Sequence, residues 1–210
     1  MPYAVKEIFK TLQGEGAQAG RASVFCRFAG CNLWSGREAD RPKAVCTFCD
    51  TDFVGLDGTA GGRYADAEAL AGTIEAEWGP GREGRYVVLT GGEPLLQVDD
   101  ALVVALHQRG FEIGVETNGT QPAPDGLDWI CVSPKADTEL VLREGHELKL
   151  VYPQEQAPPE RFEHLSFQHF FLQPMDSADA AANLRATIAY CTEHPRWRLS
   201  IQSHKMIGIR

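Results

Sequence analysis

The sequence predicts a single α/β domain whose largely parallel sheet forms a partial, open barrel. Short β-rich runs alternate with helical segments along the 210 residues, an alternation typical of parallel α/β folds. A chain of this length fits one domain, and neither a repeat nor a long linker divides it. Only about six strand–helix units fit, fewer than a closed eight-unit barrel needs. The expected strands cover residues 23–28, 86–89, 111–115, 129–132, 147–152, 169–172 and 197–201.

Three segments between these strands have the pattern of helices. The first follows Asp66, a residue type that favours the N-cap, and places Leu70, Ile74 and Trp78 on one face. The second covers residues 99–110; it begins with acids, which suit the positive end of the helix dipole, and ends at a glycine. The third covers residues 176–194, and its apolar stripe is formed by Leu184, Ile188 and Cys191.

Composition excludes several classes of function. A net charge of −9 and a pI near 5.1 argue against nucleic-acid binding, which needs clustered basic residues. No apolar run approaches the roughly 20 residues of a membrane helix, and the first residues lack the pattern of a secretory signal. We therefore expect a cytoplasmic protein with neither a nucleic-acid nor a membrane partner. Reducing conditions there disfavour disulfides, so metal binding better explains the clustered members of the six cysteines.

Polar motifs follow several of the expected strands directly. "LTGGEP", "ETNG", "SPK" and "QPMD" each stand at a carboxyl end, and a cysteine-rich loop follows the strand over residues 23–28. In parallel α/β folds, the loops at this edge of the sheet converge on one ligand site. We therefore expect all five loops to share one cavity.

The cysteine-rich loop allows two interpretations. Cys31, Cys46 and Cys49 are separated by fourteen and two residues, and Cys26 lies five positions upstream. All four could form a closed structural zinc site. Alternatively, Cys26 alternates with apolar neighbours in its strand and is a buried small hydrophobe, as we also expect for Cys131 and Cys191. Three thiolates would then hold a four-iron cluster and leave one iron without a protein ligand.

Eight motifs, in this order, resemble the radical S-adenosylmethionine superfamily and, within it, the 7-carboxy-7-deazaguanine synthase family. They are "TLQGEG" (11–16), "CRFAGCNLW" (26–34), "CTFCDT" (46–51), "LTGGEPLLQ" (89–97), "ETNGT" (116–120), "SPK" (133–135), "FLQPMD" (171–176) and "WRLSIQSHK" (197–205). The first gap between cluster cysteines is usually three residues in the superfamily and is fourteen here. We interpret residues 34–45 as an insertion, which costs little because loop-closure entropy grows slowly with length.

The resemblance implies a radical S-adenosylmethionine core, with Cys31, Cys46 and Cys49 as ligands of a 4Fe-4S cluster. Gly92 would contact the methionyl amino group of S-adenosylmethionine, Glu116 its ribose, and Thr51 a magnesium ion. The other implied cofactor contacts are Phe48, Cys49, Asp50, Ser133, Pro134, Lys135, Gln173, Pro174, Met175 and Asp176.

The implied substrate is 6-carboxy-5,6,7,8-tetrahydropterin, which the family converts to 7-carboxy-7-deazaguanine with loss of ammonia, in queuosine and other 7-deazapurine pathways. The radical chemistry belongs to the cofactors, so no side chain need act as a nucleophile. The implied substrate contacts are Leu12, Gln13, Gly14, Arg27, Thr90, His204 and Arg210. We also expect a homodimer, because a second subunit could close the open barrel, and a flavodoxin or ferredoxin as electron donor. Two alternatives remain open: an activase that generates a glycyl radical on a partner protein, and a four-cysteine zinc protein.

Overall fold

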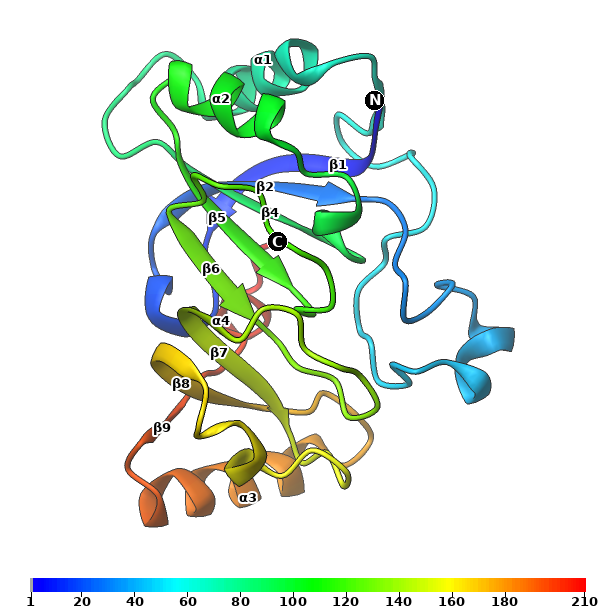
Figure 1. Ribbon diagram of the computed structural model, residues 1–210, viewed down its shortest axis with the longest axis vertical. Helices are drawn as coiled ribbons and strands as arrows, with labels where there is room; N and C mark the ends of the chain where they lie inside the picture. The colour runs from blue at the N-terminus through cyan, green and yellow to red at the C-terminus, as the bar shows by residue number, and fades with distance from the viewer. Residues whose placement is uncertain (1) are drawn as a thin grey trace.

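The computed structural model describes residues 2–210, which form one nine-stranded sheet (Figure 1). The strand order is β3-β1-β2-β4-β5-β6-β7-β8-β9. The edge strands β3 and β9 each pair with one neighbour only, so the sheet is open. The strands are β1 (Tyr3–Leu12), β2 (Ala22–Phe28), β3 (Gly62–Tyr64), β4 (Tyr86–Gly91), β5 (Glu112–Thr117), β6 (Trp129–Val132), β7 (Glu144–Tyr152), β8 (Ser166–Pro174) and β9 (Trp197–Leu199). The predicted α/β class is confirmed. All seven expected strands are present, and β1 and β3 are additional.

Most of the sheet is parallel. β2, β4, β5, β6, β7, β8 and β9 run in the same direction, whereas β1 pairs antiparallel with both β2 and β3. The carboxyl ends of the parallel strands therefore lie along one edge, where the polar motifs were expected to converge.

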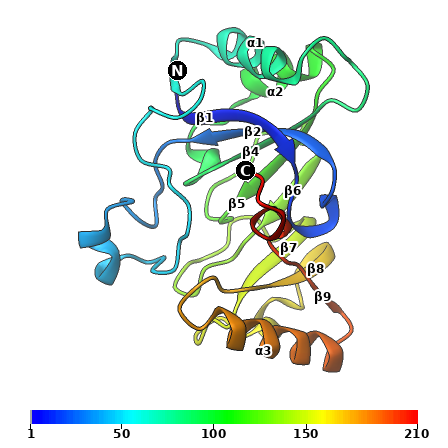
Figure 2. The same ribbon diagram turned by 180° about the vertical axis from the view of Figure 1, so that it is seen from behind.

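The helices cover the sheet in two places. α1 (Ala67–Trp78) and α2 (Asp100–Gln108) pack against each other and against β1, β2 and β5, while α3 (Ala180–Glu193) packs against β8 and β9. The short helix α4 (Ser203–Ile207) lies in front of β6 and β7 in the reverse view (Figure 2). Four 3-10 helices occupy loops: η1 (Gly16–Gln18), η2 (Glu38–Lys43), η3 (Pro94–Leu96) and η4 (Pro159–Phe162).

The apolar face predicted for the first helix is confirmed. Leu70, Ile74 and Trp78 are buried in a core that α1 and α2 form with the strands beneath them. The Asp66 side chain accepts a hydrogen bond from the Ala69 backbone N–H, as an N-cap residue should. A second buried core lies between α3 and β7–β9.

The apolar stripe predicted for the third helix is wrong in two of its three members. Leu184 is 37% exposed and Ile188 is 46% exposed. The helix is instead buried at Thr187, whose hydroxyl donates to the Asn183 carbonyl and is thereby satisfied without water. Cys191 is half-buried and packs against the second core, as expected.

No helix formed by residues 2–210 is both long and apolar enough to cross a membrane.

Candidate active site

A cavity of about 380 Å³ opens at the carboxyl edge of the parallel strands. Its walls come from β1, from the ends of β2, β4, β5, β6, β7 and β8, from the cysteine-rich loop and from the C-terminal segment. This volume is within the range of small-molecule sites.

The residues singled out from the sequence come together in this cavity, with one exception. Pro134 does not line it. The residues that do are Leu12, Gln13, Gly14, Arg27, Cys31, Cys46, Phe48, Cys49, Asp50, Thr51, Thr90, Gly92, Glu116, Ser133, Lys135, Gln173, Pro174, Met175, Asp176, His204 and Arg210.

The cysteines divide as the strand alternation predicts. Cys31, Cys46 and Cys49 line the cavity as free thiols, whereas Cys26, on β2, is fully buried in the core beneath α1 and α2. Cys131, on β6, is also buried as expected, although it borders the cavity. Burial raises the pKa of Cys26 and also raises the pKa of Cys31 and Cys46. A site that used all four cysteines would require Cys26 to leave the core, so the four-cysteine zinc interpretation is wrong.

The three cavity thiols fit a cluster better than a single ion. Among residues 2–210, no three Cys, His, Asp or Glu side chains converge closely enough to hold one metal ion. A four-iron cluster is wider than one ion, and its thiolates ligate different irons. Lys135 is half-buried near the thiols; desolvation lowers the pKa of its ammonium, and the thiolates Cys46 and Cys49 oppose that shift. A cation in this position can balance the charge of thiolates.

The loop after β4 meets the cysteine-rich loop at Gly92. A Cβ atom on Gly92 would lie 2.2 Å from the Gly30 carbonyl oxygen and 2.9 Å from the Cys31 Cβ. Only glycine permits this approach, which holds the "TGGEP" turn directly against Cys31.

Glu93, next in this turn, joins it to the loop after β5. Its buried carboxylate accepts hydrogen bonds from the Thr117 hydroxyl at 2.7 Å and from the backbone N–H groups of Asn118 and Leu95 at 2.8 and 3.0 Å. Burial nevertheless raises the pKa of Glu93. This carboxylate is already satisfied by the protein, so its role is to hold two cavity loops together.

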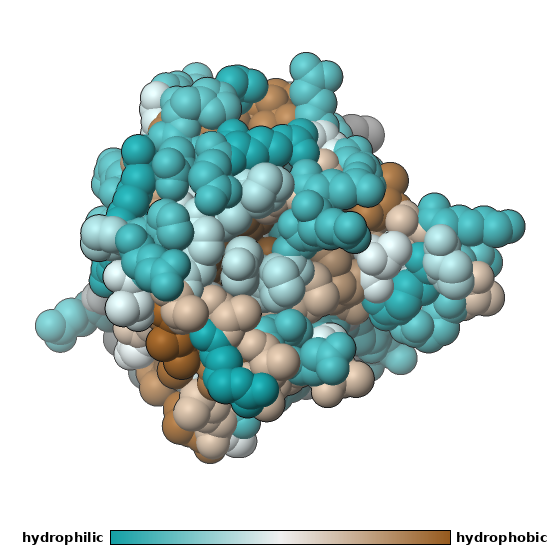
Figure 3. All heavy atoms as spheres, turned by 90° about the horizontal axis from the view of Figure 1, so that it is seen from below, coloured by the Kyte–Doolittle hydropathy of each residue, from teal (hydrophilic) through white to brown (hydrophobic). Residues whose placement is uncertain are grey.

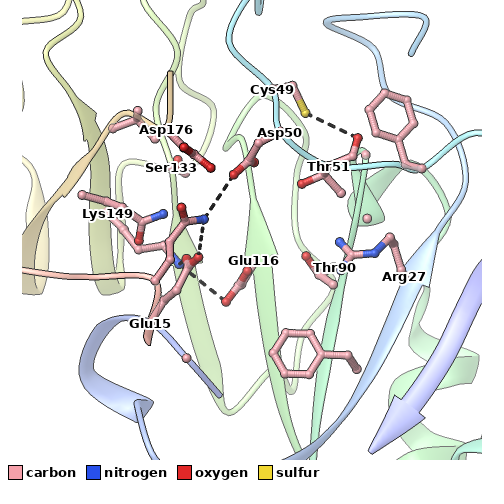
Figure 4. Close-up of a pocket in the computed structure, with 18 of the residues that line it drawn as sticks. Glu15, Arg27, Cys49, Asp50, Thr51, Thr90, Glu116, Ser133, Lys149 and Asp176 are labelled. Atoms are coloured by element: carbon pink, nitrogen blue, oxygen red, sulfur yellow. Dashed lines mark hydrogen bonds and ion pairs between the residues drawn. The ribbon is translucent and has the colours of Figure 1, made fainter. Parts of the chain in front are cut away.

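The floor of the cavity is a buried network of charged side chains (Figure 4). The Lys149 ammonium on β7 lies 2.5 Å from Glu15 and 3.6 Å from Glu116. Glu116 also accepts a hydrogen bond from the Gln13 amide at 2.9 Å. Burial lowers the pKa of Lys149, but Glu116 and Glu15 outweigh burial and raise it well above its usual value. Lys149 is therefore a permanent cation.

Arg27 and Thr90 face the same space as Glu116 (Figure 4). The Arg27 Nε atom donates to Glu7 at 2.9 Å, and Glu7 is also paired with Arg210. Within residues 2–210, no protein hydrogen bond uses the Nη atoms of Arg27. The protein therefore holds the guanidinium through Nε alone.

The C-terminal segment crosses the cavity and is tied to its other walls. The Lys205 ammonium lies 2.7 Å from Asp50 and 2.6 Å from Asp176, which belong to two separate loops. Gln202 donates to Glu15 at 3.0 Å and to Asp50 at 3.2 Å.

The site residues predicted from the sequence do not include Glu7, Glu15, Glu93, Lys149, Gln202 or Lys205. Four of these six lie within quoted motifs: Glu15 in "TLQGEG", Glu93 in "LTGGEPLLQ", and Gln202 and Lys205 in "WRLSIQSHK". Lys149 could have been found from the alternation of charged residues with Leu148 and Leu150, since a charge on an interior strand needs a partner.

Comparisons with known proteins cover the whole chain. No family model matches it. It is 73% identical over 210 residues to a 7-carboxy-7-deazaguanine synthase of Bradyrhizobium diazoefficiens, with 100% of both chains covered. It is 66% identical over 209 residues to one of Caulobacter vibrioides, again with 100% of both covered. The crystal structure of QueE from Escherichia coli is similar with a TM-score of 0.73 at 29% identity, over 97% of this chain and 95% of that one.

Proposed function

The chain belongs to the 7-carboxy-7-deazaguanine synthase family, and we propose that it converts 6-carboxy-5,6,7,8-tetrahydropterin to 7-carboxy-7-deazaguanine, with loss of ammonia, in the cavity at the strand edge. One observation carries the assignment of the site. Three free cysteines of a single loop line a small-molecule cavity, while the fourth nearby cysteine is buried in the core.

Cys31, Cys46 and Cys49 would hold a 4Fe-4S cluster within a radical S-adenosylmethionine core. The bound cluster and S-adenosylmethionine supply electron transfer and hydrogen abstraction. The protein would supply the thiolates, the half-buried Lys135 cation and a turn held against Cys31 by Gly92.

S-adenosylmethionine would bind across the loops on the cluster side. Gly92 would contact its amino group through the backbone, and Glu116 would accept hydrogen bonds from the ribose hydroxyls. The contacts of Glu116 with the Gln13 amide and the Lys149 ammonium support this role, because they orient the carboxylate. The other proposed contacts are Phe48, Cys49, Asp50, Ser133, Lys135, Gln173, Pro174, Met175 and Asp176.

The pterin would bind on the opposite side, against Arg27. Its carboxylate can accept two hydrogen bonds from the Arg27 Nη atoms, because Glu7 takes only Nε. Thr90 faces the same space, and the remaining proposed contacts are Leu12, Gln13, Gly14, His204 and Arg210. The Thr51 hydroxyl also lines this cavity and is proposed as a protein ligand of Mg²⁺. Mg²⁺ usually binds only a few protein oxygens, and substrate and water complete its coordination.

The remaining proposals concern the whole molecule. The chain is a single domain with an insertion at residues 34–45, acts in the cytoplasm, and forms a homodimer that receives electrons from a flavodoxin or ferredoxin. The open sheet supports the dimer, because both edge strands are free to be covered by a second subunit. A glycyl-radical activase is disfavoured by the enclosed floor of charged residues, which suits a small polar substrate.

The test begins with metal content. Chain purified without oxygen and supplied with iron and sulfide should bind about four irons, and Ser substitution at Cys31, Cys46 or Cys49 should abolish binding. Cys26→Ala is the matched control and should retain all the iron. One zinc and no iron would contradict the cluster.

The second test measures the reaction. The cluster-loaded protein is given reductant, S-adenosylmethionine and the pterin, and absence of both ammonia and deazapurine product would contradict the proposed reaction.

A further inference from the structure

The insertion at residues 34–45 leaves the body of the protein and returns to the same point. It projects to the right in Figure 1, and its surface is largely hydrophilic in Figure 3. At its base, the Leu33 carbonyl accepts hydrogen bonds from the N–H groups of Val45 at 3.1 Å and Cys46 at 3.3 Å. These two bonds bring the chain back beside Cys31 despite the fourteen-residue gap.

Arg41, at the centre of the insertion, reaches back to the cluster cysteines. Its Nη1 atom donates to the carbonyl oxygens of Thr47 and Cys49, each at 3.0 Å. These carbonyls flank Phe48 within the "CTFC" turn. One guanidinium nitrogen thus bridges the two ends of the short segment between the second and third cysteines.

The guanidinium is itself held from two other directions. Glu38 accepts from Arg41 Nε at 2.7 Å and from Nη2 at 2.6 Å, a bidentate contact. The Trp34 ring lies 4.0 Å from the guanidinium, and the same ring packs edge-on against Phe53 at 5.6 Å. Arg41 is therefore not a freely solvated loop residue, although its side chain is 27% exposed.

The pKa of Arg41 reflects the groups around it. The hydrogen bond to Glu38 is the main cause of the raised pKa of Arg41, and Cys49 and Cys46 add to it. The hydrogen bonds to the Thr47 and Cys49 carbonyls therefore bring a positive charge to the cysteine turn.

We propose that the insertion braces the cluster site and that Arg41 is a positioning residue for its Cys46–Cys49 half. This inference rests on the proposed function, because it assigns a role toward the cluster. The planar fork matters as much as the charge: a lysine ammonium carries charge but cannot hold Glu38 bidentately, stack on Trp34 and bridge two carbonyls at once.

The experiment compares wild type with Arg41→Met, Arg41→Lys and the control Arg37→Met. Arg37 lies in the same insertion, but it forms hydrogen bonds only through its own backbone N–H and carbonyl groups. Each protein is reconstituted without oxygen, and the rate of iron loss to a chelator is measured with the midpoint potential of the cluster. We expect iron loss about tenfold faster in Arg41→Met and intermediate in Arg41→Lys, from the lost charged hydrogen bonds. The potential should fall only in Arg41→Met, since removal of a positive charge disfavours reduction.

Three outcomes would overturn the inference. If Arg41→Met loses iron at the same rate as Arg37→Met and has the same midpoint potential, the insertion does not position the cysteines. If Arg41→Met and Arg41→Lys are equally less stable than wild type in urea unfolding of the metal-free proteins, Arg41 supports the fold in general. Wild type that takes up no iron removes the proposed function itself, and the inference with it.

Discussion

Lys149 lies 2.5 Å from Glu15 and 3.6 Å from Glu116, and is only 6% exposed at the side chain. One ammonium on β7 thus balances carboxylates from the loop after β1 and from β5. Since the cavity opens above this floor, the same contacts that stabilise the fold also fix the orientation of Glu116. Stability and binding of S-adenosylmethionine should therefore both depend on Lys149.

Lys149→Met should destabilise the metal-free protein strongly. The substitution leaves two carboxylates without their buried cation, a loss of about 3–5 kcal/mol in the free energy of unfolding. Urea unfolding measures it, with Lys43→Met as control, because Lys43 is exposed on the insertion. Equal unfolding midpoints for the two variants would show that the floor network contributes nothing to stability.

Glu15→Gln should change how stability depends on pH. Burial raises the pKa of Glu15, but the Lys149 ammonium outweighs it, and the net pKa is lowered. A lowered pKa means that the folded state favours the ionised form, so its stabilisation is complete above the unfolded pKa and is lost as pH falls through the folded value. The stability difference between wild type and Glu15→Gln should be about 2 kcal/mol at pH 7 and shrink below about pH 4.3, the value for a free glutamate.

Urea unfolding of both proteins between pH 3 and pH 7 checks this, with Glu83→Gln at an exposed position as control. A difference that stays constant over the whole range would show that Glu15 is not the group that titrates.

The fold was predictable where the sequence keeps a regular period. β4 to β8 contain apolar runs, or in β7 an alternation of apolar and charged residues, and all of these strands were expected. β1 was not, because its pairing with β2 shifts register between Val5 and Glu7. Buried positions then fall at Tyr3, Val5 and Ile8, and the extra residue of the bulge breaks the alternation of period two. β3 has three residues, too few to show a period at all.

The site was predictable as motifs but not as contacts. The strand-end rule and the resemblance located the cavity, since each motif follows a strand. The network that joins the motifs involves partners far apart in the sequence: Lys149 with Glu15, 134 residues away, and Lys205 with Asp50, 155 residues away. No local pattern encodes such pairs. Arg41 was missed for a different reason, because a charged residue in a polar loop has the pattern of a solvated surface.

Lys205→Met should weaken cofactor binding with little effect on stability. Its ion pairs with Asp50 and Asp176 are between 38% and 48% exposed, and exposed pairs contribute less than about 1 kcal/mol to folding. The two aspartates are nevertheless proposed S-adenosylmethionine contacts on separate loops, and Lys205 holds them together. Equilibrium dialysis with the cluster-loaded protein should show a dissociation constant raised about fivefold, roughly 1 kcal/mol.

Arg185→Met, an exposed substitution on α3, is the control for this measurement. An unchanged dissociation constant for Lys205→Met would indicate that the aspartates keep their positions without the lysine.

Gly14→Ala and Gly72→Ala should change stability in opposite directions. A Cβ atom on Gly14 would lie 2.3 Å from His204 Nδ1 and 3.0 Å from the His204 Cβ, so the whole side chain would have to move. The Gly14 carbonyl also accepts from the Ser203 N–H at 3.0 Å and from its hydroxyl at 2.8 Å, so displacement of His204 strains the attachment of α4 to the cavity rim. Overpacking of this kind costs about 1–3 kcal/mol.

Gly72 lies within α1, and a Cβ atom there would meet nothing within 4 Å. Alanine at this position should stabilise the helix by about 0.5–1 kcal/mol, since it loses less backbone entropy on folding. Urea unfolding of the two variants compares the signs directly, and limited proteolysis of the C-terminal segment reports where Gly14→Ala acts. If Gly14→Ala left both its unfolding midpoint and its C-terminal cleavage rate unchanged, α4 would not be held at the rim by close contact with Gly14.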